Sequence, residues 1–148
     1  GTFVACWMAD GLMAAGRFEE ALDVVRSVRR DALRGAEAVQ LPELLHMQAK
    51  ILISISPANE ARAVRLLVRS CRIARRQSAL SWELRSSLSL ARIQVRRGDC
   101  EQARRLLSTI YARFTEGFET CDLKAAAQML RELDRSHDAR ALAALGTE

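Results

Sequence analysis

Pairs of small residues recur along the chain at a nearly constant spacing, and this repeat constrains the fold more than any other feature of the sequence. Each of three stretches carries one alanine in a first helical segment and another in the segment that follows. The first alanines are 40 and 42 residues apart, and the second alanines are 42 and 40 residues apart. Small side chains at such places let two antiparallel helices approach closely. The three pairs are Ala9 with Ala21, Ala49 with Ala63, and Ala91 with Ala103.

A large apolar residue follows each second alanine by four positions, at Val25, Leu67 and Leu107. Because residues four apart share one face of a helix, this side chain would fill the space between successive pairs. Proline occurs only twice and glycine seven times in 148 residues, and this scarcity of turn residues argues against an all-β sandwich or barrel. The sequence therefore predicts an all-α fold of three helix pairs followed by a capping helix.

The periodicity of the apolar residues sets the expected bounds of these elements. The three units are predicted at about 2–34, 42–78 and 80–114, and the capping helix at 122–133. Residues 51–55 are rich in β-branched side chains, but the apolar residues around them continue one helical face, so a helix is predicted there as well. We expect one domain over residues 1–134 and a flexible or frayed tail over 135–148.

Three aromatic residues and one leucine are assigned to packing. Trp82 is expected to pack between the second and third units, because it opens the first helix of the third unit. Phe114, Phe118 and Leu123 are expected to hold the capping helix over the last apolar face, which a helical repeat must cover.

The spacing of these residues resembles the tetratricopeptide repeat. That repeat carries Leu-Gly and an aromatic on its first helix and an alanine on its second. The first unit here reads Met8-Ala9, Gly16, Phe18, Ala21 and Val25, and the third reads Leu90-Ala91, Gly98, Ala103 and Leu107. The period exceeds the 34 residues of that repeat, and its Trp, Tyr and terminal Pro are missing, so longer helices are expected. The resemblance implies a right-handed stack of helix pairs whose first helices line a concave groove.

A second resemblance concerns residues 74–133. The strings that carry it are Ser81-Trp82-Glu83-Leu84-Arg85, Phe114-Thr115-Glu116-Gly117-Phe118, and Asp122-Leu123-Lys124-Ala125. They are similar to the C-terminal end of a family of large bacterial signalling and transcriptional regulators, in which an effector domain and a P-loop ATPase module precede a helical-repeat tail. This resemblance implies a cytoplasmic, non-catalytic interaction or sensing module that binds a partner or the parent's own ATPase module. The start at Gly1-Thr2, without methionine, favours a piece of a longer protein.

The tetratricopeptide resemblance also implies a ligand site, because ligands of such repeats meet set positions on the first helices. Those positions become more basic toward the C-terminal half of the chain, and arginine suits carboxylates. We therefore expect an acidic peptide segment or a terminal carboxylate to bind there. The predicted partner-binding groove comprises His46, Lys50, Arg85, Leu88, Arg92 and Arg96, and the other mapped positions are Phe3, Cys6, Asp10, Met13, Glu43 and Ile53.

Five arginines at spacings of three and four form a stripe on one helical face. They are Arg62, Arg65, Arg69, Arg72 and Arg76. No acidic residue occurs between Glu60 and Glu83, and the net charge of the chain is +5. One interpretation is a solvated outer face that neighbouring acids neutralise. The other is a strip that binds nucleic acid or another polyanion. The stripe has no aromatic residues for single-strand stacking and no Asn or Gln for base reading.

Motifs for catalysis, cofactors and metals are missing from the sequence. It has no Gly-rich phosphate loop and no H-E-x-x-H, and its two histidines, His46 and His137, are isolated. The four cysteines are widely spaced, which favours unpaired thiols in a reducing cytoplasm. We therefore predict no enzyme activity, no cofactor and no metal site.

The predicted partner is a protein or an acidic segment, with nucleic acid as the alternative. No apolar run reaches the length of about 18 residues that indicates a membrane-spanning helix. The apolar residues Phe3, Val4 and Trp7 also allow a homodimer.

Overall fold

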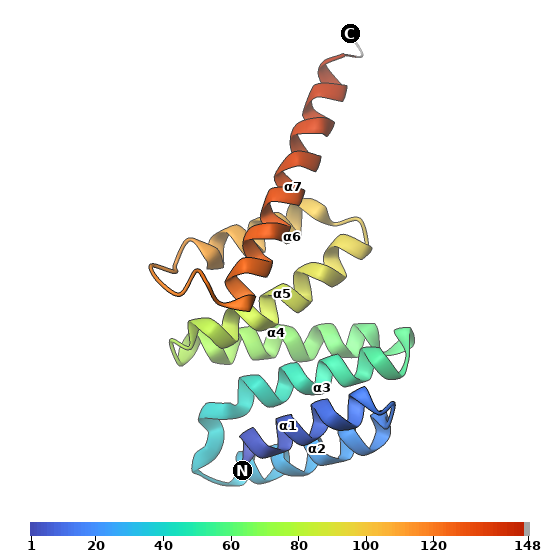
Figure 1. Cartoon of the computed structure of the whole chain (residues 1–148), viewed down its shortest axis with the longest axis vertical. Helices are drawn as coiled ribbons and strands as arrows, with labels where there is room; N and C mark the ends of the chain where they lie inside the picture. Colours follow the sequence, from blue (N-terminus) through green and yellow to red (C-terminus); the bar gives the residue numbers. More distant parts are fainter. Residues whose placement is uncertain (147–148) are drawn as a thin grey trace. The chain divides into compact units, whose positions relative to one another are not determined.

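A computed structural model describes residues 1–146 of the chain, apart from the side chains of residues 36 and 37, and all regular structure in this part is helical. The α-helices there are α1 (Thr2–Ala14), α2 (Phe18–Arg34), α3 (Leu41–Ile55), α4 (Glu60–Arg76), α5 (Leu80–Arg96), α6 (Cys100–Tyr111) and α7 (Cys121–Leu145) (Figure 1). Two short 3-10 helices, η1 (Ala36–Gln40) and η2 (Pro57–Asn59), precede α3 and α4. The all-α prediction is confirmed, and residues 51–55 lie in α3 as expected.

The chain forms two compact units, Gly1–Ser86 and Ser87–Glu148, with the boundary inside α5. The single domain expected over residues 1–134 stays a prediction. Within each unit the helices pack mainly on their neighbours in the chain: α1 on α2, α2 on α3 and α3 on α4 in the first, and α6 on α7 in the second. Such packing builds a local core in each unit.

In the first unit, α3 is the most deeply buried helix. Figure 1 shows α1 and α2 as one antiparallel pair and α3 and α4 as the next. Because α3 also contacts both α1 and α2, it is covered on several sides and carries an apolar sequence around most of its circumference. Its buried residues are Leu41, Pro42, Leu44, Leu45, His46, Met47, Gln48, Ala49, Ile51 and Leu52.

The alanines that repeat in the sequence are fully buried in both units. Ala9, Ala21, Ala49, Ala63, Ala91 and Ala103 are each 0% exposed. The large residues that follow the second alanines, Val25, Leu67 and Leu107, are at most 1% exposed. A larger side chain at any of these alanines would therefore meet atoms of the neighbouring helix.

Three helix ends close with the same pair of backbone hydrogen bonds. Gly16, Gly98 and Ser78 adopt positive φ angles of 73°, 86° and 56°. At each, the residue's N–H donates to the carbonyl three residues back, and the next N–H donates to the carbonyl five residues back, as in Gly98 to Val95 and Asp99 to Gln94. This is the Schellman arrangement, which requires a left-handed residue and so favours glycine.

Replacing Gly98 with alanine is expected to lower the free energy of unfolding by about 1 kcal/mol, because a Cβ is strained in the left-handed region. A Cβ there meets no atom within 4 Å, so the cost comes from the backbone alone. Ser78→Gly is expected to raise the stability by about 0.5 kcal/mol for the same reason. Urea unfolding followed by circular dichroism measures both.

Gly11→Ala is the matched control for these substitutions. Gly11 lies inside α1 with open space around it, so the same glycine-to-alanine change should stabilise the protein by roughly 0.5–1 kcal/mol. A loss of stability for Gly11→Ala, or a gain for Gly98→Ala, would contradict this account of the turns.

A buried polar chain joins α3, α4 and the start of α5. Ser70 of α4 is fully buried, and its hydroxyl donates to the carbonyl of Pro42 at 2.8 Å. The hydroxyls of Ser70 and Ser86 are 2.7 Å apart. Because Ser70 has one proton and uses it on Pro42, Ser86 is the donor between the two hydroxyls. Nearby, Arg75 donates to the carboxylate of Glu83 at 2.8 Å, and Glu83 is 1% exposed.

Ser70→Ala is expected to lower the free energy of unfolding by about 1–3 kcal/mol, because the buried hydroxyl of Ser86 loses its acceptor and the carbonyl of Pro42 loses a donor. Urea unfolding again gives the value. Ser108→Ala removes a hydroxyl that bonds the carbonyl of Arg105 at the surface, and it should change the stability by less than about 0.5 kcal/mol. Equal effects of the two substitutions would contradict a structural role for the buried chain.

The last helix is longer than the sequence predicted. The capping helix was expected over 122–133 with a frayed tail beyond it, but α7 runs from Cys121 to Leu145 as one helix. Two contacts with α6 lie on the added part: Asp134 is 3.7 Å from Arg104, and His137 is 3.5 Å from Glu101. These contacts join residues far apart in the sequence, so the helical pattern alone could not reveal them.

The aromatic residues around the start of α7 are only partly in the core. Leu123 is buried as predicted, and Phe114 is half-buried. Phe118 is 42% exposed, so its assignment to the core was wrong. Its ring packs on Tyr111 with the centroids 5.8 Å apart. Phe118 lies in the link between α6 and α7, next to Gly117 in the left-handed region.

Candidate functional site

Lys50 and Arg85 of the predicted groove both lie in the compact unit Gly1–Ser86, and each forms an ion pair with a carboxylate. Lys50 of α3 bonds Asp10 of α1 at 3.0 Å, and Arg85 of α5 bonds both oxygens of Glu43 of α3 at 2.9 and 3.0 Å. These pairs span 40 and 42 residues, which are also the separations of the repeated alanines. Each pair therefore joins corresponding positions of successive first helices.

The other predicted groove residues do not share one environment. His46 is buried in α3, and Leu88 is buried in the second unit. Arg92 and Arg96 also belong to the second unit and are exposed. Met13 and Ile53 are half-buried. The structure thus brings together only part of the predicted set, namely the residues of α1, α3 and the first two turns of α5.

That part surrounds a hollow of about 450 Å³, which we call the aromatic hollow. Its walls hold three large aromatic side chains, of which Phe3 is 85% exposed and Trp7 is 76% exposed. Phe3, Trp7 and Asp10 follow one another at spacings of four and three, so they lie on one face of α1. The residues lining the hollow are Thr2, Phe3, Cys6, Trp7, Asp10, Gln40, Glu43, Trp82 and Arg85.

Sequence reasoning found five of these residues and missed two tryptophans. Phe3, Cys6, Asp10, Glu43 and Arg85 were mapped from the repeat. Trp82 was assigned to packing and Trp7 to an apolar end of the chain, yet both line the hollow. The spacing of Trp7 from Phe3 and Asp10 was the signal that could have placed it.

The electrostatic field at the floor of the hollow is negative. The pKa of the Cys6 thiol is raised to about 11, first by burial and then by the carboxylates of Glu43 and Asp10, while Arg85 opposes them less strongly. Two of the lining residues carry a carboxylate and one carries a guanidinium, while Lys50, which pairs with Asp10, lies outside the lining. The site therefore disfavours an added negative charge.

The rate at which Cys6 is alkylated is expected to depend on the raised pKa of its thiol. With a pKa near 11, the thiolate fraction at pH 8 is roughly 100-fold below that of an ordinary thiol. Iodoacetamide rates measured against pH by mass spectrometry of the Cys6 peptide should rise with a midpoint near pH 11. Asp10→Asn removes a negative charge and should lower that midpoint.

Asp23→Asn serves as the control for this profile, because Asp23 is an exposed residue of α2 outside the aromatic hollow. Its midpoint should match that of the unmodified protein. A midpoint at or below pH 9 in the unmodified protein would contradict the raised pKa of Cys6, and an unchanged midpoint in Asp10→Asn would contradict the contribution of the Asp10 carboxylate.

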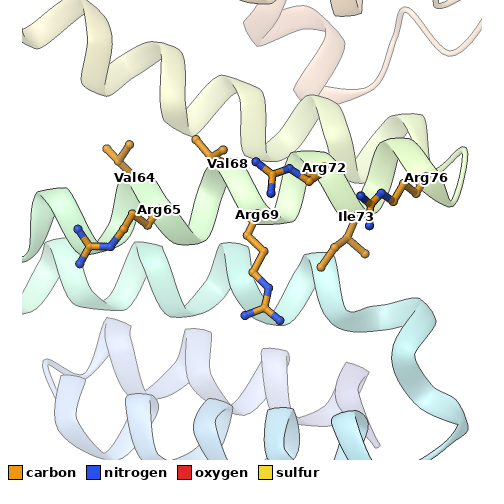
Figure 2. A pocket seen from close by; sticks show the side chains of 7 residues that line it. All are labelled: Val64, Arg65, Val68, Arg69, Arg72, Ile73 and Arg76. Carbon is orange, nitrogen blue, oxygen red and sulfur yellow. The ribbon is translucent and has the colours of Figure 1, made fainter.

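The predicted arginine stripe lies on α4 as expected, and all five of its residues are exposed. Figure 2 shows Arg65, Arg69, Arg72 and Arg76 projecting from α4, with Val64, Val68 and Ile73 between them around a shallow hollow of about 500 Å³. Arg75 is not part of this face, because its guanidinium bonds Glu83. Apolar residues thus alternate with the arginines along the helix.

Three arginines of α2 extend this basic surface, and sequence reasoning missed them. Arg26, Arg29 and Arg30 line a second hollow of about 560 Å³ together with Arg62 of α4. Arg29 and Arg30 follow Arg26 by three and four positions, so all three lie on one side of α2. This spacing was the signal in the sequence. We define the arginine face as the following eight residues: Arg26, Arg29, Arg30, Arg62, Arg65, Arg69, Arg72 and Arg76.

Within residues 1–146 no cluster of three or more His, Cys, Asp or Glu side chains could hold a metal ion. The same residues include no helix with both the length and the apolarity needed to cross a membrane. Cys6 and Cys71 are buried, Cys100 is half-buried and Cys121 is exposed, and none of the four forms a disulfide.

Comparisons with family models, curated proteins and solved structures found no match for this chain. The aromatic hollow and the arginine face are therefore interpreted from their own geometry.

Proposed function

We propose that this chain is a protein-interaction module, built as a tetratricopeptide-like helical repeat, that captures a basic segment of a partner protein in the aromatic hollow. The exposure of Phe3 and Trp7 beside two carboxylates is the observation that carries the proposal. In a signalling or transcriptional regulator, such a module would bind a partner or another domain of the same chain.

Three regularities support the repeat. The six alanines of the pairs are all fully buried. The turns at Gly16 and Gly98, one in the first unit of the repeat and one in the third, use the same hydrogen bonds. Ion pairs link first helices at separations of 40 and 42 residues, which match the period. A stack of similar helix pairs would produce all three.

The aromatic walls supply the binding energy for an apolar or flat side chain. Phe3 and Trp7 expose most of their surface to solvent, and covering an aromatic side chain is worth about 2–3 kcal/mol. Exposed apolar residues gathered beside a hollow of this kind mark interaction sites in soluble proteins. Trp82, which also lines the hollow, is half-buried.

The charge of the hollow favours a cationic side chain over an anionic one. The carboxylate of Asp10 is about half-exposed although it bonds Lys50, so it can accept a further donor. An arginine or lysine of a partner could donate to Asp10 while its charge lies over the ring of Trp7, and cations bind favourably to indole faces.

The acidic ligand that the sequence predicted would bind at the aromatic hollow only with a cost in free energy. To reach Lys50 or Arg85, its carboxylate would have to replace Asp10 or Glu43. Breaking a pair that already exists returns little net free energy, because one carboxylate merely replaces another. For this reason the proposal assigns the basic segment to the aromatic hollow.

Intrinsic fluorescence tests the proposal directly, because Trp7 and Trp82 are the two tryptophans of the chain and both line the hollow. A peptide alternating arginine and leucine should change the emission and reach saturation. A peptide of equal length with glutamate for arginine should leave it unchanged. Asp10→Asn should weaken binding of the arginine peptide by about 10-fold, as expected for the loss of a charge-assisted hydrogen bond.

Asp138→Asn is the matched control, since Asp138 is an exposed residue of α7, and it should leave the affinity unchanged. Equal or tighter binding of the glutamate peptide would overturn the charge assignment. Emission that changes with protein concentration alone would indicate that a second copy of the chain occupies the hollow, and the proposed partner would then be wrong.

A further inference from the structure

We propose that the arginine face binds the sugar-phosphate backbone of duplex DNA without reading its sequence. This inference is independent of the aromatic hollow, which is lined by residues of α1, η1, α3 and α5, whereas the arginine face belongs to α2 and α4.

Among the described residues, the five arginines of the stripe on α4 have no ionic partner, unlike Arg75 of the same helix. Within the described residues, no carboxylate lies within 4.0 Å of the guanidinium groups of Arg62, Arg65, Arg69, Arg72 or Arg76. Asp23 is the one acidic residue among those that line the second hollow. The interpretation in which neighbouring acids neutralise the stripe therefore has no support within the described residues.

Arg29 shows how crowded this positive charge is. Burial lowers the pKa of its guanidinium, and the charges of Arg69 and Arg62 lower it further. One of its amino groups donates to Gln48 at 2.7 Å. Its Nε is buried with no hydrogen-bond partner among the described residues. An anion bound beside Arg29 would relieve the repulsion between the guanidinium groups of the two helices.

The dimensions of the face suit a nucleic-acid backbone. From Arg62 to Arg76, α4 extends about 21 Å. Duplex DNA carries one phosphate per 3.4 Å on each strand, so about six phosphates of a strand lie along this length. Eight guanidinium groups spread over two neighbouring helices can contact a comparable number of phosphates. An acidic protein segment with so many charges in register would be unusual.

The composition of the face favours the backbone of a duplex over unpaired bases. No aromatic side chain lies among the residues that line the two hollows of the face, so bases have nothing to stack on. Gln48 is the one amide side chain among them, and its oxygen already accepts from Arg29. Contacts of this kind hold phosphates and carry no sequence information.

Fluorescence anisotropy of a labelled 20-base-pair duplex, measured over a series of salt concentrations, tests the proposal. The unmodified chain should bind with a Kd in the micromolar range or below at low salt, and the affinity should fall steeply as salt rises. The triple substitution Arg65→Gln, Arg69→Gln and Arg72→Gln should reduce the salt slope by about 2.7, or about 0.9 for each lost phosphate contact. Near 0.1 M salt the affinity should fall by roughly 500-fold relative to the unmodified chain, if the two bind equally at 1 M.

The matched control removes the same charge from another surface. Arg131→Gln, Arg135→Gln and Arg140→Gln change three exposed arginines of α7, and the affinity should stay within about 3-fold of the unmodified chain. Circular dichroism and the arginine-peptide titration confirm that both variants are folded. Both should bind that peptide normally, so failure of this proposal is distinguishable from failure of the proposed function.

Three results would overturn the inference. The first is absence of DNA binding at low salt. The second is an equal loss of affinity in the two triple variants, which would indicate only a response to net charge. The third is tighter binding of an oligo-glutamate peptide than of the duplex at equal charge, which would assign the face to an acidic protein instead.

Discussion

Close contact between paired helices at fully buried alanines is the constraint on which the remaining structure depends. Ala9, Ala21, Ala49 and Ala63 are fully buried, and their small size lets each second helix pack closely against its first helix. This close packing turns the outer side of α4 to solvent and leaves α3 covered by its neighbours. Both candidate surfaces depend on this close packing. Side chains that do not fit between the paired helices either line a hollow or project into solvent.

Patterns within a single helix could be predicted from the sequence, whereas contacts between helices mostly could not. The alanine spacing and the exposed arginines of α4 depend only on 3.6-residue periodicity, and both were found. The hydrogen bonds of Ser70 and the neighbours of Arg29 depend on which helices pack together, so they appear only in the structure. The pairs Asp10–Lys50 and Glu43–Arg85 lie between these cases, because their separations equal the repeat period and could have been recognised from it.

The end of the chain shows a different limit of sequence reasoning. The apolar periodicity of α7 stops near Leu133, its last buried residue, and the prediction ended the helix there. The following residues are mostly good helix formers and polar residues, so the helix continues to Leu145 without a core of its own. In this added part of α7, Asp134 and His137 contact α6. Burial and helicity therefore end at different residues.

The arginine face also has a consequence for the stability of the protein. Its guanidinium groups repel one another across α2 and α4, with Asp23 as the one acidic residue lining either of its hollows. Mobile ions screen such repulsion over about 10 Å at 0.1 M, so added salt should strengthen the first unit, in contrast to proteins whose surfaces rely on ion pairs. Anions that bind the folded form stabilise it further by mass action. The melting temperature of this chain is therefore a property of the protein together with its buffer, and a phosphate buffer and a chloride buffer of equal pH would report different values.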